Sequence, residues 1–220
     1  MKFINKFSIL LLLLFVSFQS CVEEESIMSE VETFKSIDDL PTDDRFVEVI
    51  LGSINLTIQA DSDRIDRAQE LMNQGNLNVA NQAEIAEILG YSSWDAFTDY
   101  NEKQQELIKE LNADYNLAAY DVEELKGYST QVYDYIMESQ ATARDDLIGG
   151  LAVGGVLNPC IDACNRTLIL CIVAEGISHL IGIVRCTLIS NPFCYIENII
   201  VSIIVTVNCF PEHAACVAAC

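Results

Sequence analysis

Residues 160–220 read CIDACNRTLILCIVAEGISHLIGIVRCTLISNPFCYIENIIVSIIVTVNCFPEHAACVAAC and hold all but one of the nine cysteines of the chain. The cysteines stand at 160, 164, 171, 186, 194, 209, 216 and 220, so the steps between them are 4, 7, 15, 8, 15, 7 and 4. This series is the same in both directions. Steps of 4, 7 and 15 return to nearly one side of an α-helix, which predicts two helical arms with their cysteines on one face.

The two arms are predicted to form an antiparallel hairpin closed by nested disulfides. Facing residues of such a hairpin have a constant sum of positions, and four cysteine pairs share the sum 380. Asn158 and Pro159 start the first arm as cap and first helical residue, and Ser190-Asn191-Pro192 gives a turn within the connection Thr187–Phe193. The predicted pairs are Cys160–Cys220, Cys164–Cys216, Cys171–Cys209 and Cys186–Cys194.

Pro211 interrupts this pattern in the second arm. It predicts a kink near Phe210, with Glu212–Cys220 as a separate helical turn on the first arm. A zinc site is the alternative use of the cysteines, but the sequence has no CxxC pair and the steps span whole helices. Disulfides are therefore favoured, and no metal or other cofactor is expected.

The arms are apolar nearly all round, which is typical of a helix that is buried or in a membrane. Glu175, His179 and Arg185 interrupt the first arm, so neither arm is a clean spanning helix. Two interpretations stay open. Either the acidic part of the chain covers the hairpin, or the hairpin is stored for insertion into a target membrane.

The N-terminus predicts export. Residues 1–20 have two lysines followed by the apolar run Phe7–Phe18, as in a signal peptide. Ser20-Cys21 then resembles the lipobox of bacterial lipoproteins, which implies a lipid on Cys21 and anchoring to a membrane of the cell envelope. This use of Cys21 leaves an even number of cysteines for disulfides. The alternative is ordinary cleavage with Cys21 as a free thiol.

Glu23–Glu25, which follow this cysteine after Val22, resemble an acidic signal that sends some Gram-negative lipoproteins across the outer membrane to the cell surface. A solvated linker is the alternative. Residues 22–156 hold 29 acidic and 8 basic residues, whereas residues 157–220 hold only 4 and 2. An acidic exterior repels phosphate backbones and anionic lipid, which excludes nucleic acid as an expected partner.

The acidic middle of the chain predicts an all-α bundle. Ser92 is predicted to cap its longest helix, with Asp95 completing a capping box. Asp61-Ser62-Asp63 is similar to the start of a calcium loop, but Ile65 and Asp66 stand where such a loop needs an oxygen ligand and a glycine, so helix capping is favoured. The predicted helices begin near Thr42, span Arg64–Met72 and Asn81–Leu89, run from Ser92 to about Leu111, and span Ser129–Leu147.

The expected organisation is all-α, with an acidic helical bundle followed by a disulfide-stapled antiparallel helical hairpin. Residues 147–156 are a glycine-rich apolar linker that resembles a double-glycine processing site of bacteriocin leaders. The segments are a signal peptide (1–20), a lipidated acidic tether (21–32), an acidic helical domain (33–146), the linker (147–156) and the cysteine-rich hairpin (157–220).

Two functions are compatible with these features. The first is a lipid-anchored envelope or surface protein with a disulfide-rich binding or scaffolding module, which acts on a protein partner. The second rests on Cys160-Ile161-Asp162-Ala163-Cys164 and the ending Ala215–Cys220, which resemble cysteine-rich modules of halocin-type bacteriocin precursors and imply action on a target-cell membrane. An enzyme is not expected, because His179 and His213 are the only histidines and no catalytic constellation surrounds them in sequence.

Overall fold

The computed structural model describes residues 33–75, 77–139, 158–189 and 192–220, and every regular element among them is helical. The predicted all-α fold is thereby confirmed. Outside the described residues lie the predicted signal peptide, Cys21, the predicted tether and linker, and the turn residues Ser190 and Asn191. The acidic part contains η1 (Ile37–Thr42), α2 (Asp44–Gln59), η2 (Ser62–Arg64), α3 (Ile65–Asn73), α4 (Val79–Ile88), α5 (Trp94–Tyr115), η3 (Leu117–Ala119), α6 (Val122–Lys126) and α7 (Ser129–Ser139).

The cysteine-rich part contains α9 (Pro159–Ile189), α10 (Pro192–Val207) and α11 (Cys209–Ala219). As predicted, Asn158 caps α9, since its Oδ1 accepts a hydrogen bond of 3.0 Å from the Cys160 amide. Pro192 stands at the first position of α10, where its missing N–H costs no helical bond. The arms are therefore longer, and the connection shorter, than the sequence indicates.

Four helix starts in the acidic part differ from the prediction by one or two residues. α3 starts at Ile65 rather than Arg64, and α4 starts at Val79 rather than Asn81. The chain at Leu40-Pro41 forms the 3-10 turn η1, so α2 starts at Asp44, with Asp43 Oδ1 accepting from the Arg45 amide at 3.0 Å. The cap of α5 is Ser93 rather than Ser92, because the Ser93 hydroxyl accepts from the Ala96 amide at 3.1 Å. Two adjacent serines offer the same capping chemistry, so the residue type alone does not distinguish them.

The helix ends in the acidic part follow local backbone rules. Gly90 comes after α4 with φ +83°, and a Cβ there would lie 2.7 Å from the Gln59 backbone oxygen, so only glycine fits. Asn116 ends α5 in the left-handed region with φ 52°. The side chain of Arg45 joins the first turn of α2 to the last turn of α5, with Nη2 2.7 Å from carboxylate oxygens of both Asp43 and Asp114.

Acidic and cysteine-rich helices share their cores, and all of them belong to one compact unit that runs from Phe34 to Cys220. A Cβ at Gly176 of α9 would lie 3.3 Å from Ile50 of α2, so the two helices touch there. The larger core contains buried residues of α2, α5, α6, α7 and α9, among them Phe46, Ile50, Ile54, Ile108, Val132, Ile172, Val173 and Ile177. The smaller contains residues of α3, α4, α5 and α10, among them Leu71, Ile85, Ile88, Phe97, Ile196, Ile200 and Ile203.

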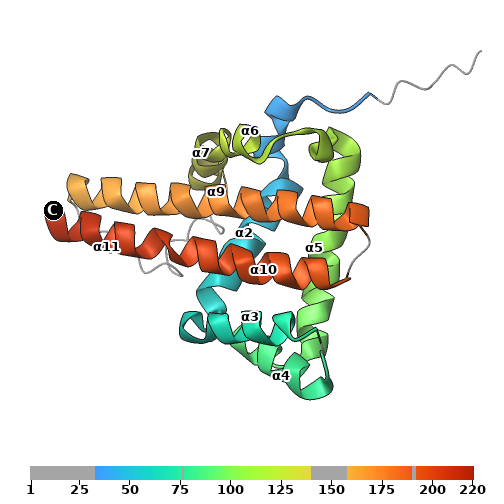
Figure 1. Ribbon diagram of the computed structural model, residues 1–220. Helices are drawn as coiled ribbons and strands as arrows, with labels where there is room; N and C mark the ends of the chain where they lie inside the picture. The colour runs from blue at the N-terminus through green and yellow to red at the C-terminus, as the bar shows by residue number, and fades with distance from the viewer. Residues whose placement is uncertain (1–32, 76, 140–157, 190–191) are drawn as a thin grey trace, which may run out of the picture. The chain divides into compact units, whose positions relative to one another are not determined.

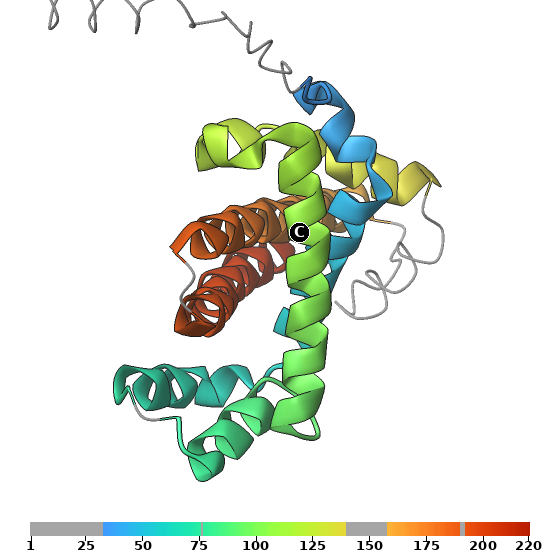
Figure 2. The ribbon, with the colours of Figure 1, turned by 90° about the vertical axis from the view of Figure 1, so that its right-hand side faces the viewer.

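Figures 1 and 2 show α10 and α11 following one another along α9, with α2 and α5 crossing the hairpin. α6 and α7 pack on α9, and α3 packs on α10. The first arm is consequently covered by the acidic helices, whereas α11 packs on α9 and has an exposed outer surface. This arrangement determines which disulfides are accessible to solvent.

Candidate functional site

Four disulfides join the arms, and they are the pairs that the constant sum predicts. The Cα–Cα distances are 5.7 Å for Cys160–Cys220, 5.8 Å for Cys164–Cys216, 6.0 Å for Cys171–Cys209 and 5.5 Å for Cys186–Cys194. The sequence separations are 60, 52, 38 and 8, so each bridge encloses the next. The nearly constant distance shows that the two arms keep one separation from the turn to the chain end.

The second arm bends without losing this register. α10 ends at Val207 and α11 starts at Cys209, so the interruption lies at Asn208, two residues before Phe210, and the separate helix starts three residues before the predicted Glu212. A proline ring clashes with the carbonyl four residues before it, which for Pro211 is the carbonyl of Val207. In the first turn of α11 the proline is tolerated, because the amides there have no helical acceptor. α11 continues along α9, and Cys216 and Cys220 reach their partners.

A polar pair lies between the arms, with Asn198 one helical turn and buried His179 two turns from the innermost bridge. Asn198 of α10 hydrogen-bonds His179 of α9, and a Cβ at Gly182 would overlap the Asn198 amide. Gly182 and Asn198 also share the sum 380, so glycine provides the space that the register requires. Burial lowers the pKa of His179 to about 4. In the described part of the chain, His179 Nδ1 and Asn198 Oδ1 have no hydrogen-bond partner.

The four bridges differ in exposure. Cys186 and Cys209, at 2% and 3%, place the two inner bridges against the core. Cys160, Cys216 and Cys220 are exposed, and Cys164 is the one buried cysteine of the two outer bridges. We call the two bridges Cys160–Cys220 and Cys164–Cys216, with the helix ends that carry them, the hairpin tip. It is the open end of the hairpin, opposite the turn between α9 and α10.

The two bridges of the hairpin tip touch each other. Cys164 Sγ lies 3.7 Å from Cys220 Sγ, and these two sulfurs and that of Cys160 all lie within 4.8 Å of one another. Thiolates, rather than disulfide sulfurs, are the metal ligands of cysteine. The sulfur cluster is therefore explained by two adjacent disulfides.

Polar contacts hold the side chains near the hairpin tip. His213 Nε2 of α11 lies 2.9 Å from Asn165 Oδ1 of α9 and ties the two helices beside the outer bridges. Arg166 of α9 lies over the ring of Tyr133 and 3.8 Å from a carboxylate oxygen of Asp134, both on α7. The first turns of α9 are thus joined to the acidic helices, while α11 is joined to α9.

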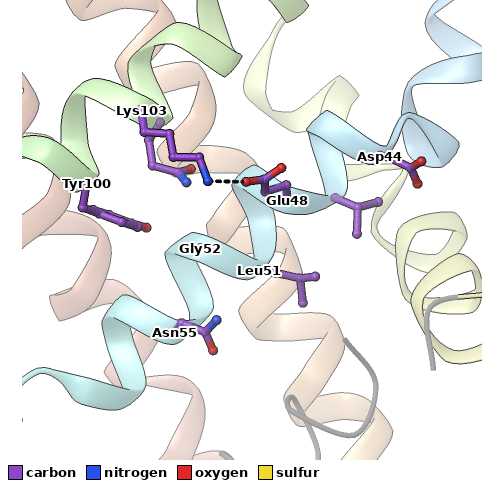
Figure 3. A pocket seen from close by; sticks show the side chains of 9 residues that line it. Asp44, Glu48, Leu51, Gly52, Asn55, Tyr100 and Lys103 are labelled. Carbon is purple, nitrogen blue, oxygen red and sulfur yellow. Dashed lines mark ion pairs between the residues drawn. The ribbon is translucent and has the colours of Figure 1, made fainter. Parts of the chain in front are cut away.

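A second candidate site is a polar groove between α2 and α5, which sequence reasoning does not find (Figure 3). Its volume is about 480 Å³, and Lys103 Nζ crosses it to reach Glu48 Oε1 at 3.2 Å. A Cβ at Gly52 would lie 2.8 Å from Tyr100 Oη, so this glycine lets α5 side chains lie over α2. Burial raises the pKa of Tyr100, which keeps its hydroxyl protonated as a donor. The groove can form hydrogen bonds with a small polar molecule.

Two helical stretches, Pro159–Thr187 and Phe193–Ala219, are long and apolar enough to cross a membrane. The core helix of a soluble protein passes the same test, and most of the first stretch is buried. Cys21 lies outside the described residues. The chain matches no family model, no curated protein and no solved structure.

Proposed function

We propose that this is an exported protein, anchored to the cell envelope by lipid on Cys21, whose stapled hairpin acts as a binding or scaffolding module. The anchor is supported by the signal-peptide pattern and Ser20-Cys21 in the sequence. Glu23–Glu25 are compatible with either face of the outer membrane, the inner face or the cell surface. We propose no catalytic activity.

The observation that carries the binding role is a rigid exposed element at the end of the hairpin. α11 has its outer face in solvent, and disulfides hold both of its ends to α9. A surface that is ordered before binding loses little conformational entropy on association. Small side chains cover this face, and Glu212 is its one acidic residue, so it differs from the charged surface of the acidic helices. The exposed alanines of α11 are Ala214, Ala215, Ala218 and Ala219.

A protein partner fits this face better than an anionic membrane. Small residues let another backbone approach closely, and the acidic helices beside the hairpin repel anionic lipid. Val201 and Val205 of α10, which are 45% and 38% exposed, extend the apolar surface from α11 along the same arm. The lipid on Cys21 is then the contact with the membrane, and the hairpin is the contact with the partner.

A bacteriocin-like precursor is the second candidate, favoured by the two stretches that are long enough to cross a membrane. Action on a target membrane requires release of the hairpin from the acidic helices. Release exposes residues of α9 that are fully buried here, such as Val173, Ile177 and Leu180. At about 25 cal/mol per Å² of apolar surface, this exposure is costly in water. Because the hairpin shares its core with the acidic helices, we favour a hairpin that stays packed against them.

Mass measurement of the mature protein distinguishes the candidates. We expect a chain that starts at lipidated Cys21, ends at Cys220 and carries four disulfides. The Cys21→Ser variant should leave the membrane fraction, and equal membrane partitioning of variant and parent would refute the anchor. A free C-terminal fragment in the medium, cut near Gly150 or Gly155, would instead favour the bacteriocin-like precursor.

A further inference from the structure

We propose that the hairpin tip is a thiol–disulfide exchange site for low-molecular-weight thiols, in which attack on Cys160–Cys220 passes to Cys164–Cys216 and emerges as a free thiol on Cys216. This inference is independent of the proposed function, since it depends only on the arrangement of the four cysteines of the hairpin tip. Three features carry it: the exposure of the outer bridge, the contact between the two outer bridges, and the burial of Cys164.

Exposure restricts entry of a thiol to the hairpin tip. Exchange starts when a thiolate reaches a disulfide sulfur, so exposed bridges are the labile ones. Cys160 and Cys220 are both exposed, whereas the two inner bridges each have a buried cysteine, Cys209 or Cys186, against the core. Within the hairpin tip, Cys164–Cys216 has one buried cysteine and Cys160–Cys220 has both cysteines exposed, so an external thiol meets Cys160–Cys220 first.

Contact between the bridges allows the second step. A thiolate RS⁻ attacks Cys160 Sγ, the RS–Sγ bond forms, the Cys160–Cys220 bond breaks, and Cys220 leaves as a thiolate. That thiolate starts 3.7 Å from Cys164 Sγ, at about the contact distance of two sulfurs. It attacks Cys164, a Cys164–Cys220 bond forms, the Cys164–Cys216 bond breaks, and Cys216 leaves as a thiolate that takes a proton from water.

The exchange conserves electrons, since two disulfides and one thiol are present before and after. Cys164 is 1% exposed, so an external thiol has poor access to its sulfur, while Cys220 already touches it. Cys216 is exposed and becomes available to solvent when it is released. The mixed disulfide on Cys160 marks where the thiol entered, and the free thiol on Cys216 marks where the exchange ended.

Peptide mapping of the full-length oxidised protein tests this relay. The folded protein is treated with a small excess of glutathione at pH 8, quenched with acid, alkylated and digested without reduction. We expect glutathione on Cys160, a new Cys164–Cys220 link and alkylated Cys216, with Cys171–Cys209 and Cys186–Cys194 intact. Alkylation of Cys220 with Cys164–Cys216 intact would overturn the relay, and so would reaction of the inner bridges at the rate of the outer one.

Two double variants test the order of the steps. Cys164→Ala with Cys216→Ala removes the acceptor, so the reaction should stop at the mixed disulfide with Cys220 alkylated. Cys171→Ala with Cys209→Ala is the matched control, which loses one bridge of the same hairpin and should still release Cys216. Loss of Cys216 release in this control would contradict a relay confined to the hairpin tip. The parent protein alone gives the decisive map if either variant fails to fold.

Discussion

The acidic helices and the cysteine-rich arms hold their positions by different means. In the acidic part, noncovalent contacts join the elements: apolar faces pack in the cores, and surface ion pairs link neighbouring helices, for example Arg67 of α3 with Glu84 of α4 at 3.0 Å. Between the arms, four disulfides do this. Among the described residues, the ion pairs of the arms run to the acidic helices, as in Lys126–Glu175 at 3.3 Å and Arg166–Asp134.

The difference follows from the side chains that each region offers. An amphipathic helix such as α2 has one apolar face, so its rotation is fixed by burial of that face. A helix that is apolar nearly all round gains similar burial in several rotations and offsets. Disulfides between cysteines whose positions sum to 380 fix how far one arm is shifted along the other. The contact of Gly182 with Asn198, which have the same sum, fits that shift alone. Surface ion pairs contribute only about 0–1 kcal/mol each, which would not select it.

The largest expected effect is at the contact between the two regions. Ile50 of α2 is fully buried against Gly176 of α9. We expect Ile50→Ala to lower the free energy of unfolding by about 2–5 kcal/mol, and to do so in a single transition because both regions share the core. Urea unfolding followed by circular dichroism measures this.

Val201→Ala is the matched control, because Val201 lies on the exposed face of α10. Its effect should stay within about 0.5 kcal/mol. If Ile50→Ala produced two separate transitions, with the hairpin retaining the stability of the parent, the acidic helices and the hairpin would be two independently folding domains.

The next effect concerns the bridges themselves. Cys171–Cys209 has a sequence separation of 38, against 8 for Cys186–Cys194. Because a disulfide restricts the unfolded chain more when it closes a longer loop, replacing the first pair by alanines should cost about 2–4 kcal/mol, and replacing the second should cost less. Thermal unfolding of both variants measures the difference. A larger loss of stability for the variant without Cys186–Cys194 would contradict the expectation that the bridge closing the longer loop contributes more.

Cysteine positions in the sequence predict the bridges because disulfide geometry admits only facing residues. The helix starts at Asn158-Pro159 and the stop at Gly90 follow from equally local rules. The interruption of the second arm is also a local effect of Pro211, but the sequence prediction placed it at the neighbouring residue instead of at the carbonyl that the ring meets. Local chemistry thus predicted most of the hairpin.

Tertiary contacts could not be predicted in the same way. Apolar arms fit a buried hairpin and a membrane-bound one equally well. Packing of acidic helices on α9, as of Ile50 on Gly176, shows which of the two the fold has. The exposure of Cys220 beside buried Cys164 also depends on where α11 lies. The groove at Gly52 has no sequence signal, since it is formed by side chains from two helices that meet in the fold.

The buried His179 makes the stability of the folded protein depend on pH. The folded-state pKa of His179 is lowered to about 4 by burial, from an ordinary value of 6.5. The folded state therefore binds fewer protons than the unfolded state between these values, and its stability is full above pH 6.5 and falls as the pH drops toward 4. The total loss from this group is at most roughly 3 kcal/mol.

His179→Gln keeps a hydrogen-bonding side chain but removes this titration. The difference in unfolding free energy between parent and variant should be constant above pH 7 and should shift in favour of the variant between pH 6.5 and 4. Urea unfolding across this range measures it. A difference that does not change with pH would show that His179 is accessible to protons in the folded protein, and that the arms are less tightly packed than the structure shows.

The smallest effect tests a cap in the acidic region, where noncovalent contacts fix the helices. The Ser93 hydroxyl accepts from the Ala96 amide at 3.1 Å, and α5 then starts at Trp94. Loss of such a cap leaves an amide at the helix start without its acceptor, so Ser93→Ala should cost about 1 kcal/mol. Ser92→Ala, one residue away, is the matched control and should change the stability by less than about 0.5 kcal/mol. Equal losses at both positions would show that the two serines share the role. A larger loss at Ser92 would restore the cap that the sequence predicts and extend α5 by one residue at its start, because the helix would then begin at Ser93.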